Sequence, residues 1–272
     1  MAIAETGPGW LFCPADRPER FAKAAAAADV VILDLEDGVA AKDREQARAA
    51  LIETPLDPDR TVVRVNPAAT DDHAADLEAL AKTKYSTVML AKTEDPQQIR
   101  DLAPLDVVVL IETPLGAVVV NELARIDNAF ALMWGAEDLF AVTGGTANRW
   151  PDGSYRDVAK HVRSQTLLAA KAYGRMALDS VYLDIRNLDG LRGEADDAVA
   201  VGFDAKVAIH PTQVAVIRDA YTPTADQTDW ARRVLDTARG ERGVFQFEGI
   251  MVDAPVLRRA ERIVQLAPHP GT

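Results

Sequence analysis

The sequence predicts a (β/α)8 barrel, an α/β fold in which eight parallel strands alternate with helices. Two observations predict it. Eight short apolar or β-branched segments recur along the chain, and segments with a helical pattern separate most of them. The strand-like segments are apolar at both odd and even positions, as expected of strands buried on both faces. A doubly wound open sheet is the competing fold, and the count of eight favours the barrel.

The predicted elements follow one another in a regular order. The strands are Trp10–Cys13, Val30–Leu35, Thr61–Val65, Ser86–Leu90, Val107–Ile111, Phe130–Trp134, Ser180–Asp184 and Lys206–His210. Helical segments include Pro18–Ala28, Lys42–Glu53, Asp72–Lys82, Leu115–Arg125, Asp157–Tyr173 and Gln213–Ala220. Two further helices, Asp226–Arg239 and Pro255–Leu266, flank a short VFQFEG segment. We therefore expect residues 1–222 to form the barrel and residues 223–272 to form a C-terminal helical extension.

Composition limits the possible partners. The chain of 272 residues has a formal charge of −12, so nucleic acid and anionic membranes are not expected to be general partners. A single cysteine, Cys13, excludes an internal disulfide framework and a thiolate metal site. The N-terminal MAIAETGPGW has no signal-peptide pattern, and no apolar run approaches the ~18 residues of a membrane span. We expect a cytoplasmic protein.

Polar residues follow the predicted strands, at the end of a parallel barrel where active sites lie. They are Asp16, Arg17, Glu36, Asp37, Arg64, Asn66, Lys92, Glu112, Glu137, Asp138, Asp184 and His210. Each alone is readily explained as a loop residue or a helix cap. Their convergence on one mouth of the barrel is what indicates a functional site.

Glu112 and Asp138 follow two consecutive predicted strands, whose ends lie ~5 Å apart in a sheet. One carboxylate from each strand could hold a single hard cation, and Mg²⁺ commonly takes one or two protein carboxylates, with water and substrate oxygens as its other ligands. Zinc is less favoured because thiolates and histidine-rich spacing are absent. Helix capping by Asp138 and pairing of Glu112 with a base is the alternative.

The segment VVILDLEDGV places acids directly after a buried strand. Asp34 and Glu36 should share one face, while Asp37 begins a turn with Gly38. Beside a divalent ion, such acids could hold its water ligands or orient a basic residue such as Arg64. A simple turn is the alternative for Asp37.

Two lysines and one histidine allow other interpretations. Lys92 and Lys206 lie where a Schiff-base aldolase could carry its amine, which gives a rival, metal-free mechanism. His210 ends the eighth strand and is interpreted as a hydrogen-bonding support of the loops.

Eight motifs, spread in order over nearly the whole chain, carry a resemblance to a known family. They are GWLFCPADRPERFAKA, VILDLEDGV, VRVNP, VMLAKTED, IETPLGA, WGAEDL, AIHPTQV and GIMVDAP. Together they resemble the citrate lyase β-subunit-like proteins of the HpcH/HpaI aldolase superfamily. The stand-alone members, which include citramalyl-CoA and related β-hydroxyacyl-CoA lyases, are the most similar.

The resemblance implies a TIM barrel that assembles as a homotrimer or hexamer, with Mg²⁺ held by Glu112 and Asp138. It implies that Arg64 holds a carboxylate or the reacting carbonyl oxygen, with Glu36 and Asp37 beside it among the catalytic residues. The backbone of Gly135, Ala136 and Glu137 should line the same substrate pocket.

The resemblance also assigns roles at the two ends of the chain. Asp253, in the C-terminal extension of a neighbouring subunit, should lie over the site and move a proton; an N-cap before Pro255 is its alternative role. The first motif implies contacts to coenzyme A, made by Pro14, Arg17, Arg20 and Lys23.

The implied activity is Mg²⁺-dependent cleavage of a short β-hydroxyacyl-CoA thioester to an acyl-CoA and a keto acid. A citrate lyase β subunit acting on a carrier-bound citryl group, with oxaloacetate as product, is one alternative. A barrel that has lost catalysis and serves as a scaffold is another.

Overall fold

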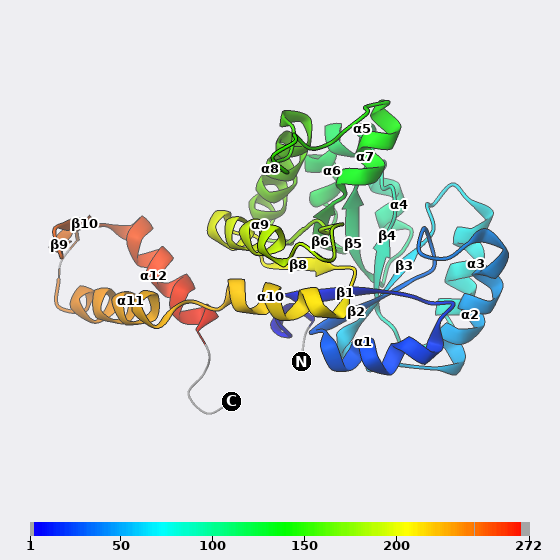
Figure 1. The fold of residues 1–272 in the computed structure, drawn as a ribbon, viewed down its shortest axis with the longest axis horizontal. Coiled ribbons are helices and arrows are strands. Elements are labelled where there is room, and N and C mark those ends of the chain that lie inside the picture. Colours follow the sequence, from blue (N-terminus) through cyan, green and yellow to red (C-terminus); the bar gives the residue numbers. More distant parts are fainter. Residues whose placement is uncertain (1–2, 242, 268–272) are drawn as a thin grey trace. The chain divides into compact units, whose positions relative to one another are not determined.

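The computed structural model describes residues 3–241 and 243–267. Its eight parallel strands close into a barrel in chain order, with β1 paired to both β2 and β8, and helices surround them (Figure 1). The strands are β1 (Gly9–Pro14), β2 (Val30–Asp34), β3 (Thr61–Val65), β4 (Thr87–Leu90), β5 (Asp106–Ile111), β6 (Ala129–Trp134), β7 (Met176–Asp179) and β8 (Ala205–Ala208). The prediction of a (β/α)8 barrel is confirmed.

Helices occupy every connection between consecutive strands, as is usual for connections between parallel strands. They are α1 (Phe21–Ala27), α2 (Arg44–Glu53), α3 (Asp71–Leu80), α4 (Pro96–Arg100), α5 (Pro114–Val118), α6 (Val120–Ala124), α7 (Ala136–Thr143), α8 (Asp157–Ala172), α9 (Leu188–Val201) and α10 (Pro211–Tyr221). The predicted helix Leu115–Arg125 is in fact two short helices, because the chain leaves helical geometry at Val119 (φ −98°, ψ 11°).

Alternate residues of the strands fill the barrel. One buried cluster takes a residue of one parity from each strand. Its strand members are Trp10, Val30, Ile32, Val62, Met89, Val108, Leu110, Ala131, Met133, Leu178, Ala205 and Val207. Residues of the other parity, such as Trp134, Asp179 and Lys206, therefore point outward, toward the helices. This alternation decides which strand-end side chains reach the barrel mouth.

The seventh strand was predicted wrongly. It lies at Met176–Asp179, and the predicted segment 180–184 is a loop in which Asp184 is exposed at the surface. The predicted segment was chosen for its consecutive Val181, Tyr182 and Leu183. The real strand is only four residues long and is defined by its pairing with β6 and β8. Asp184 consequently does not end a barrel strand.

The chain divides into two compact units, residues 1–217 and 218–272. In the second unit, α11 (Ala225–Ala238) and α12 (Ala254–Leu266) pack together around Ala231, Val234, Val252 and Ala260. An antiparallel hairpin of β9 (Phe245–Phe247) and β10 (Ile250–Val252) joins these two helices. No helix in the described ranges is long and apolar enough to cross a membrane.

Candidate active site

The inward-facing residues at the strand ends gather charged groups at the barrel mouth. Asp34 and Arg64 are paired in register on β2 and β3, and both are buried. Glu112 has the inward parity of Leu110 and is only 3% exposed. We call Asp34, Glu36, Asp37, Arg64, Lys92, Glu112 and Asp138 the mouth cluster.

Arg64 is fixed on several sides. Its Nε and Nη2 donate to the two carboxylate oxygens of Asp34 at 2.7 and 2.6 Å, and its Nη1 lies 3.2 Å from Oε2 of Glu36. The guanidinium carbon is 4.7 Å from the ring centroid of Phe12. Although burial opposes it, the charge of Asp34 raises the pKa of Arg64, so this side chain is cationic at every physiological pH.

Lys92 connects four segments of the mouth. Its backbone N–H donates to Oε1 of Glu112 at 2.9 Å. Its ammonium contacts Glu36 and lies 3.0 Å from Asp37 and 3.3 Å from Asp138. The residue adopts a left-handed conformation with φ of 50°, which is strained for a side chain other than glycine.

These contacts argue against the Schiff-base alternative. Although partial burial opposes it, the hydrogen bond to Glu36 raises the pKa of Lys92, and a Schiff-base lysine must lose its proton. Lys206, the other candidate, is fully buried and points away from the barrel interior.

Glu112 is buried, and the partly exposed carboxylate of Asp138 repels it. Burial, together with the charge of Asp138, raises the pKa of Glu112 to about 8. Gly135 makes room for this carboxylate, because a Cβ at that position would lie 2.9 Å from Glu112 Oε2. A cation between the two carboxylates would remove the repulsion that raises this pKa.

The mouth cluster as a whole has an excess of negative charge. Five carboxylates surround two cationic side chains, Arg64 and Lys92. Within residues 3–241 and 243–267, no group of three or more His, Cys, Asp or Glu side chains has the geometry to hold a metal by itself. Two carboxylates plus water and substrate oxygens are a usual Mg²⁺ environment, so the residues present fit this ion.

The first turn of α7 lies next to this carboxylate pair. Gly135 is the N-cap residue and follows β6, whose Trp134 is paired in register with Ile111 of β5. Ala136, Glu137 and Asp138 form the first turn, where backbone N–H groups lack helical partners and favour an anion. The side chain of Glu137 is exposed and accepts a hydrogen bond from Asn148 at 2.7 Å.

Three of the four residues with a predicted role in coenzyme A binding line one cavity. This cavity, of about 340 Å³, is lined by Pro14, Arg20 and Lys23 together with Phe12, Cys13 and His210, among others. Arg17 is not among the lining residues and lies 3.9 Å from Asp16 instead. His210 Nδ1 is 2.8 Å from the hydroxyl of Thr212, which is compatible with its predicted supporting role.

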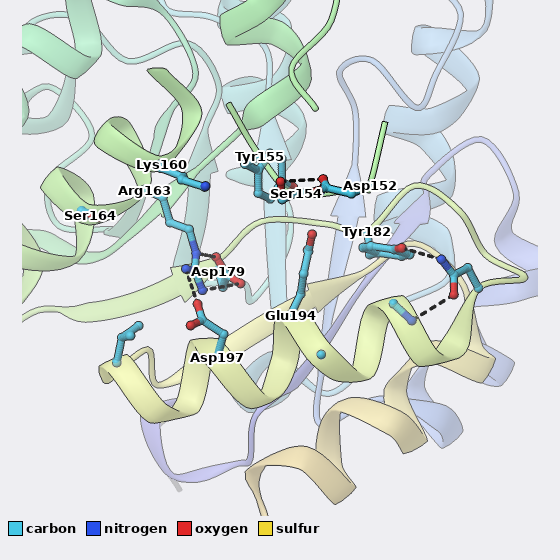
Figure 2. A pocket seen from close by; sticks show the side chains of 15 residues that line it. Asp152, Ser154, Tyr155, Lys160, Arg163, Ser164, Asp179, Tyr182, Glu194 and Asp197 are labelled. Carbon is cyan, nitrogen blue, oxygen red and sulfur yellow. Dashed lines mark hydrogen bonds and ion pairs between the residues drawn. The ribbon is translucent and has the colours of Figure 1, made fainter. Parts of the chain in front are cut away.

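A larger cavity, of about 590 Å³, lies on the outer side of the barrel wall (Figure 2). It borders a second group of charges, which we call the outer cluster. The outer cluster consists of Arg149, Arg163, Asp179, Glu194, Asp197 and Lys206. Figure 2 shows Arg163 between Asp179 and Asp197, to which it donates at 2.9 and 2.6 Å.

The outer cluster is balanced in charge, with three carboxylates and three cations. Lys206 donates to Asp179 at 2.9 Å and to the carbonyl of Ser180 at 2.8 Å. Although burial opposes it, the charges of Lys206 and Arg163 lower the pKa of Asp179 to about 2. Since its charges are already paired, this larger cavity is a weaker candidate active site than the mouth.

Two further residues complete the account of the predicted site. Asp253 is the N-cap of α12 in the second unit and accepts from Val256 N at 3.3 Å, so its capping role is observed and its proton-transfer role stays a prediction. Asp34 was predicted, together with Glu36, as an acid that could orient Arg64, but it was not among the predicted catalytic or binding residues. Its shared face with Glu36 was the available signal, but the pairing with Arg64 depends on strand register.

Comparison with known proteins agrees with the fold and the motifs. The family model described as HpcH/HpaI aldolase/citrate lyase matches residues 9–211. A citrate lyase subunit beta-like protein of Mycobacterium tuberculosis is 61% identical over 267 residues, which are 98% of each chain. A mitochondrial citramalyl-CoA lyase of Rattus norvegicus is 32% identical over 272 residues, covering 88% of this chain and 79% of that protein.

A solved structure is also similar. The M. tuberculosis protein CitE, in complex with magnesium, acetoacetate and coenzyme A, superposes with a TM-score of 0.94 at 61% identity, covering 97% of this chain and 99% of that one. The fold and the motifs define the class as a lyase built on a (β/α)8 barrel. The chain belongs to the HpcH/HpaI aldolase/citrate lyase family.

Proposed function

We propose that this enzyme is a Mg²⁺-dependent carbon–carbon lyase of short β-hydroxyacyl-CoA thioesters. Substrates of the citramalyl-CoA, malyl-CoA or 3-hydroxy-3-methylglutaryl-CoA type would give an acyl-CoA, such as acetyl-CoA, and a keto acid. The observation that carries the proposal is the unbalanced mouth cluster, in which Lys92 contacts both Glu112 and Asp138 and the charges of Asp138 and Arg64 act on Glu112. The ligands named for the M. tuberculosis structure and the activity named for the rat relative support it.

In this proposal Glu112 and Asp138 hold the ion. An ion bound there would supply Lewis acidity to the keto-acid half of the substrate. Lys92 fixes Oε1 of Glu112 through its backbone N–H, and its ammonium holds Asp138 in place. Glu36 and Asp37 act by keeping this ammonium at the mouth.

Arg64 supplies the second cationic contact. When the substrate hydroxyl loses its proton, the bond between the hydroxyl carbon and the thioester α-carbon breaks. Its electron pair moves to the α-carbon and gives a thioester enolate, while the hydroxyl carbon becomes the carbonyl of the keto acid. Arg64 donates to the deprotonated hydroxyl oxygen, which becomes the carbonyl oxygen of the keto acid. Buried donors of this kind stabilise a transition state strongly. The backbone N–H groups of Ala136 and Glu137, in the first turn of α7, would bind the substrate carboxylate.

The proton steps need a further group. A carboxylate such as Asp253, brought by a neighbouring subunit of a homotrimer or hexamer, would take the hydroxyl proton and return one to the enolate carbon. The coenzyme A moiety would use the cavity lined by Pro14, Arg20 and Lys23, because two cationic side chains there suit its phosphates. Arg17 does not line this cavity, but it is exposed and lies three residues before Arg20, so it would add a third cation at the cavity rim.

A mass-spectrometric assay tests the proposal. Purified protein is incubated with each of the three thioesters and with free citrate, with and without Mg²⁺, beside Glu112→Ala. We expect one thioester to be cleaved, with loss of cleavage both in EDTA and in the variant. Asp197→Asn, a carboxylate substitution in the outer cluster, is the matched control and should retain activity.

The competing functions are separate outcomes of this assay. Survival of all three thioesters would contradict the stand-alone lyase. Cleavage of a citryl thioester on an acyl-carrier protein to oxaloacetate would then identify a citrate lyase β-subunit activity. Inactivity on both kinds of substrate would favour a non-catalytic scaffold.

A further inference from the structure

We infer that Asp34 is the positioning residue of the mouth, because one buried carboxylate sets the direction of Arg64 and the shape of the acidic turn beside it. The inference rests on the proposed function for the role of Arg64. Asp34 is 3% exposed and lies at the carboxyl end of β2. It does not have to touch substrate to act.

The first contact set fixes the guanidinium. Asp34 accepts from Nε and Nη2 of Arg64, which is the two-point geometry that best constrains a planar guanidinium. Phe12 lies against one face of the same group. The N–H groups of Arg64 that do not bind Asp34 are on Nη1 and Nη2. The position of the carboxylate therefore determines which edge of the guanidinium is available at the mouth.

The second contact set fixes the turn. The oxygens of Asp34 also accept from the backbone N–H of Glu36 at 3.0 Å and from that of Gly38 at 2.9 Å. A Cβ at Gly38 would lie 2.2 Å from Asp34 Oδ2, so glycine is needed for this approach. Glu36 and Asp37, which lie in this turn, both contact the Lys92 ammonium.

Asp34 therefore determines the placement of both cationic side chains of the mouth, Arg64 directly and Lys92 through the turn. Four hydrogen bonds use its two oxygens fully. An amide in its place has one acceptor oxygen and an NH₂ group that would face a donor of Arg64 or of the turn. Asp34→Asn thus changes orientation while it preserves side-chain volume.

The test compares Asp34→Asn with Asp179→Asn, which makes the same change at a buried aspartate of the outer cluster that also binds an arginine. Both variants are assayed at a temperature where circular dichroism shows them folded. We expect kcat/KM of Asp34→Asn to fall about 10–100-fold, as for other residues that orient a ligand-binding group. Asp179→Asn should stay within about threefold of wild type, as expected far from the chemistry.

A rescue experiment separates positioning from a merely structural role. In Arg64→Ala, added methylguanidinium should bind to Asp34 and restore part of the activity, whereas Arg64→Ala/Asp34→Asn should show no rescue. Equal rescue in both variants, or a kcat/KM of Asp34→Asn equal to that of Asp179→Asn, would overturn the inference.

A further readout does not require turnover. Methylguanidinium should raise the Tm of Arg64→Ala by more than it raises the Tm of Arg64→Ala/Asp34→Asn, because the ligand binds only when the carboxylate is present. If wild-type protein cleaves no thioester, the proposed function fails, but this Tm comparison still tests Asp34. An equal Tm shift in the two variants would refute its role as the guanidinium anchor.

Discussion

The mouth cluster and the outer cluster use the same residue types to opposite effect. In the outer cluster three cations match three carboxylates, and the pKa of Asp179 is lowered to about 2. At the mouth five carboxylates face two cations, and the pKa of Glu112 is raised to about 8. The difference teaches that a charge-balanced cluster of ion pairs does not by itself mark a site, whereas an excess of one charge at a barrel mouth is typical of a ligand-binding site.

The largest expected loss of stability follows from a substitution in the outer cluster. Asp179→Asn removes the carboxylate that neutralises Lys206 and Arg163, and an unpaired buried charge costs about 3–5 kcal/mol. Urea unfolding should show this loss of stability, with kcat nearly unchanged. A variant as stable as wild type would mean that the outer cluster is not held by its ion pairs.

The corresponding carboxylate-to-amide substitution at the mouth should lower catalytic activity. Glu112→Gln is expected to lower kcat/KM about 10²–10³-fold, since the Mg²⁺ that Glu112 would hold, and its stabilisation of negative charge in the transition state, are lost. In EDTA at neutral pH the same variant should have a higher Tm than wild type, because folding of wild type forces a proton onto Glu112, whose pKa is raised to about 8, whereas glutamine needs none. A lower Tm in EDTA would contradict the unbalanced-charge interpretation.

Magnesium should stabilise only when the mouth is intact. At a Mg²⁺ concentration of 100 Kd, binding to the folded state adds about 2.7 kcal/mol to the free energy of unfolding. Wild type and Asp179→Asn should both gain this stability in thermal unfolding, and Glu112→Gln should not. Equal stabilisation of all three proteins would place the ion elsewhere.

Acid should weaken the outer cluster in a defined pH range. The folded-state pKa of Asp179 is below its ordinary value of 3.8, so its stabilising effect is complete above that value and is lost as the pH falls toward 2. The shift corresponds to about 2 kcal/mol. The stability difference between wild type and Asp179→Asn should shrink by this amount between pH 5 and 2. A difference that stays constant over this range would show that the ion pairs do not lower the pKa of Asp179.

The smallest effect concerns the cavity with a proposed role in coenzyme A binding. Arg20→Ala or Lys23→Ala should raise KM for the thioester about two- to fivefold, because exposed ion pairs contribute little each. The increase should diminish at high salt. Lys42→Ala, at an exposed lysine outside that cavity, is the control.

Sequence patterns were sufficient for much of the molecule. The recurrence of buried strands predicted the barrel, and seven of the eight strands overlap their predicted segments because their cores are strongly apolar. The adjacency of Glu112 and the β6–α7 turn also followed from consecutive parallel strands. The seventh strand escaped prediction, since the pairing of MALD with its neighbours is a nonlocal property.

The sequence by itself determined the fold class, the family motifs and the set of polar residues at the strand ends. Only the tertiary structure decided which charges meet. The two-point contact of Asp34 with Arg64, the position of Lys92 between Glu36 and Asp138, and the burial that raises the pKa of Glu112 all depend on strand register and on closure of the barrel. The physical reason is that apolar periodicity is local along the chain, whereas ion pairing and desolvation arise from groups brought together across it.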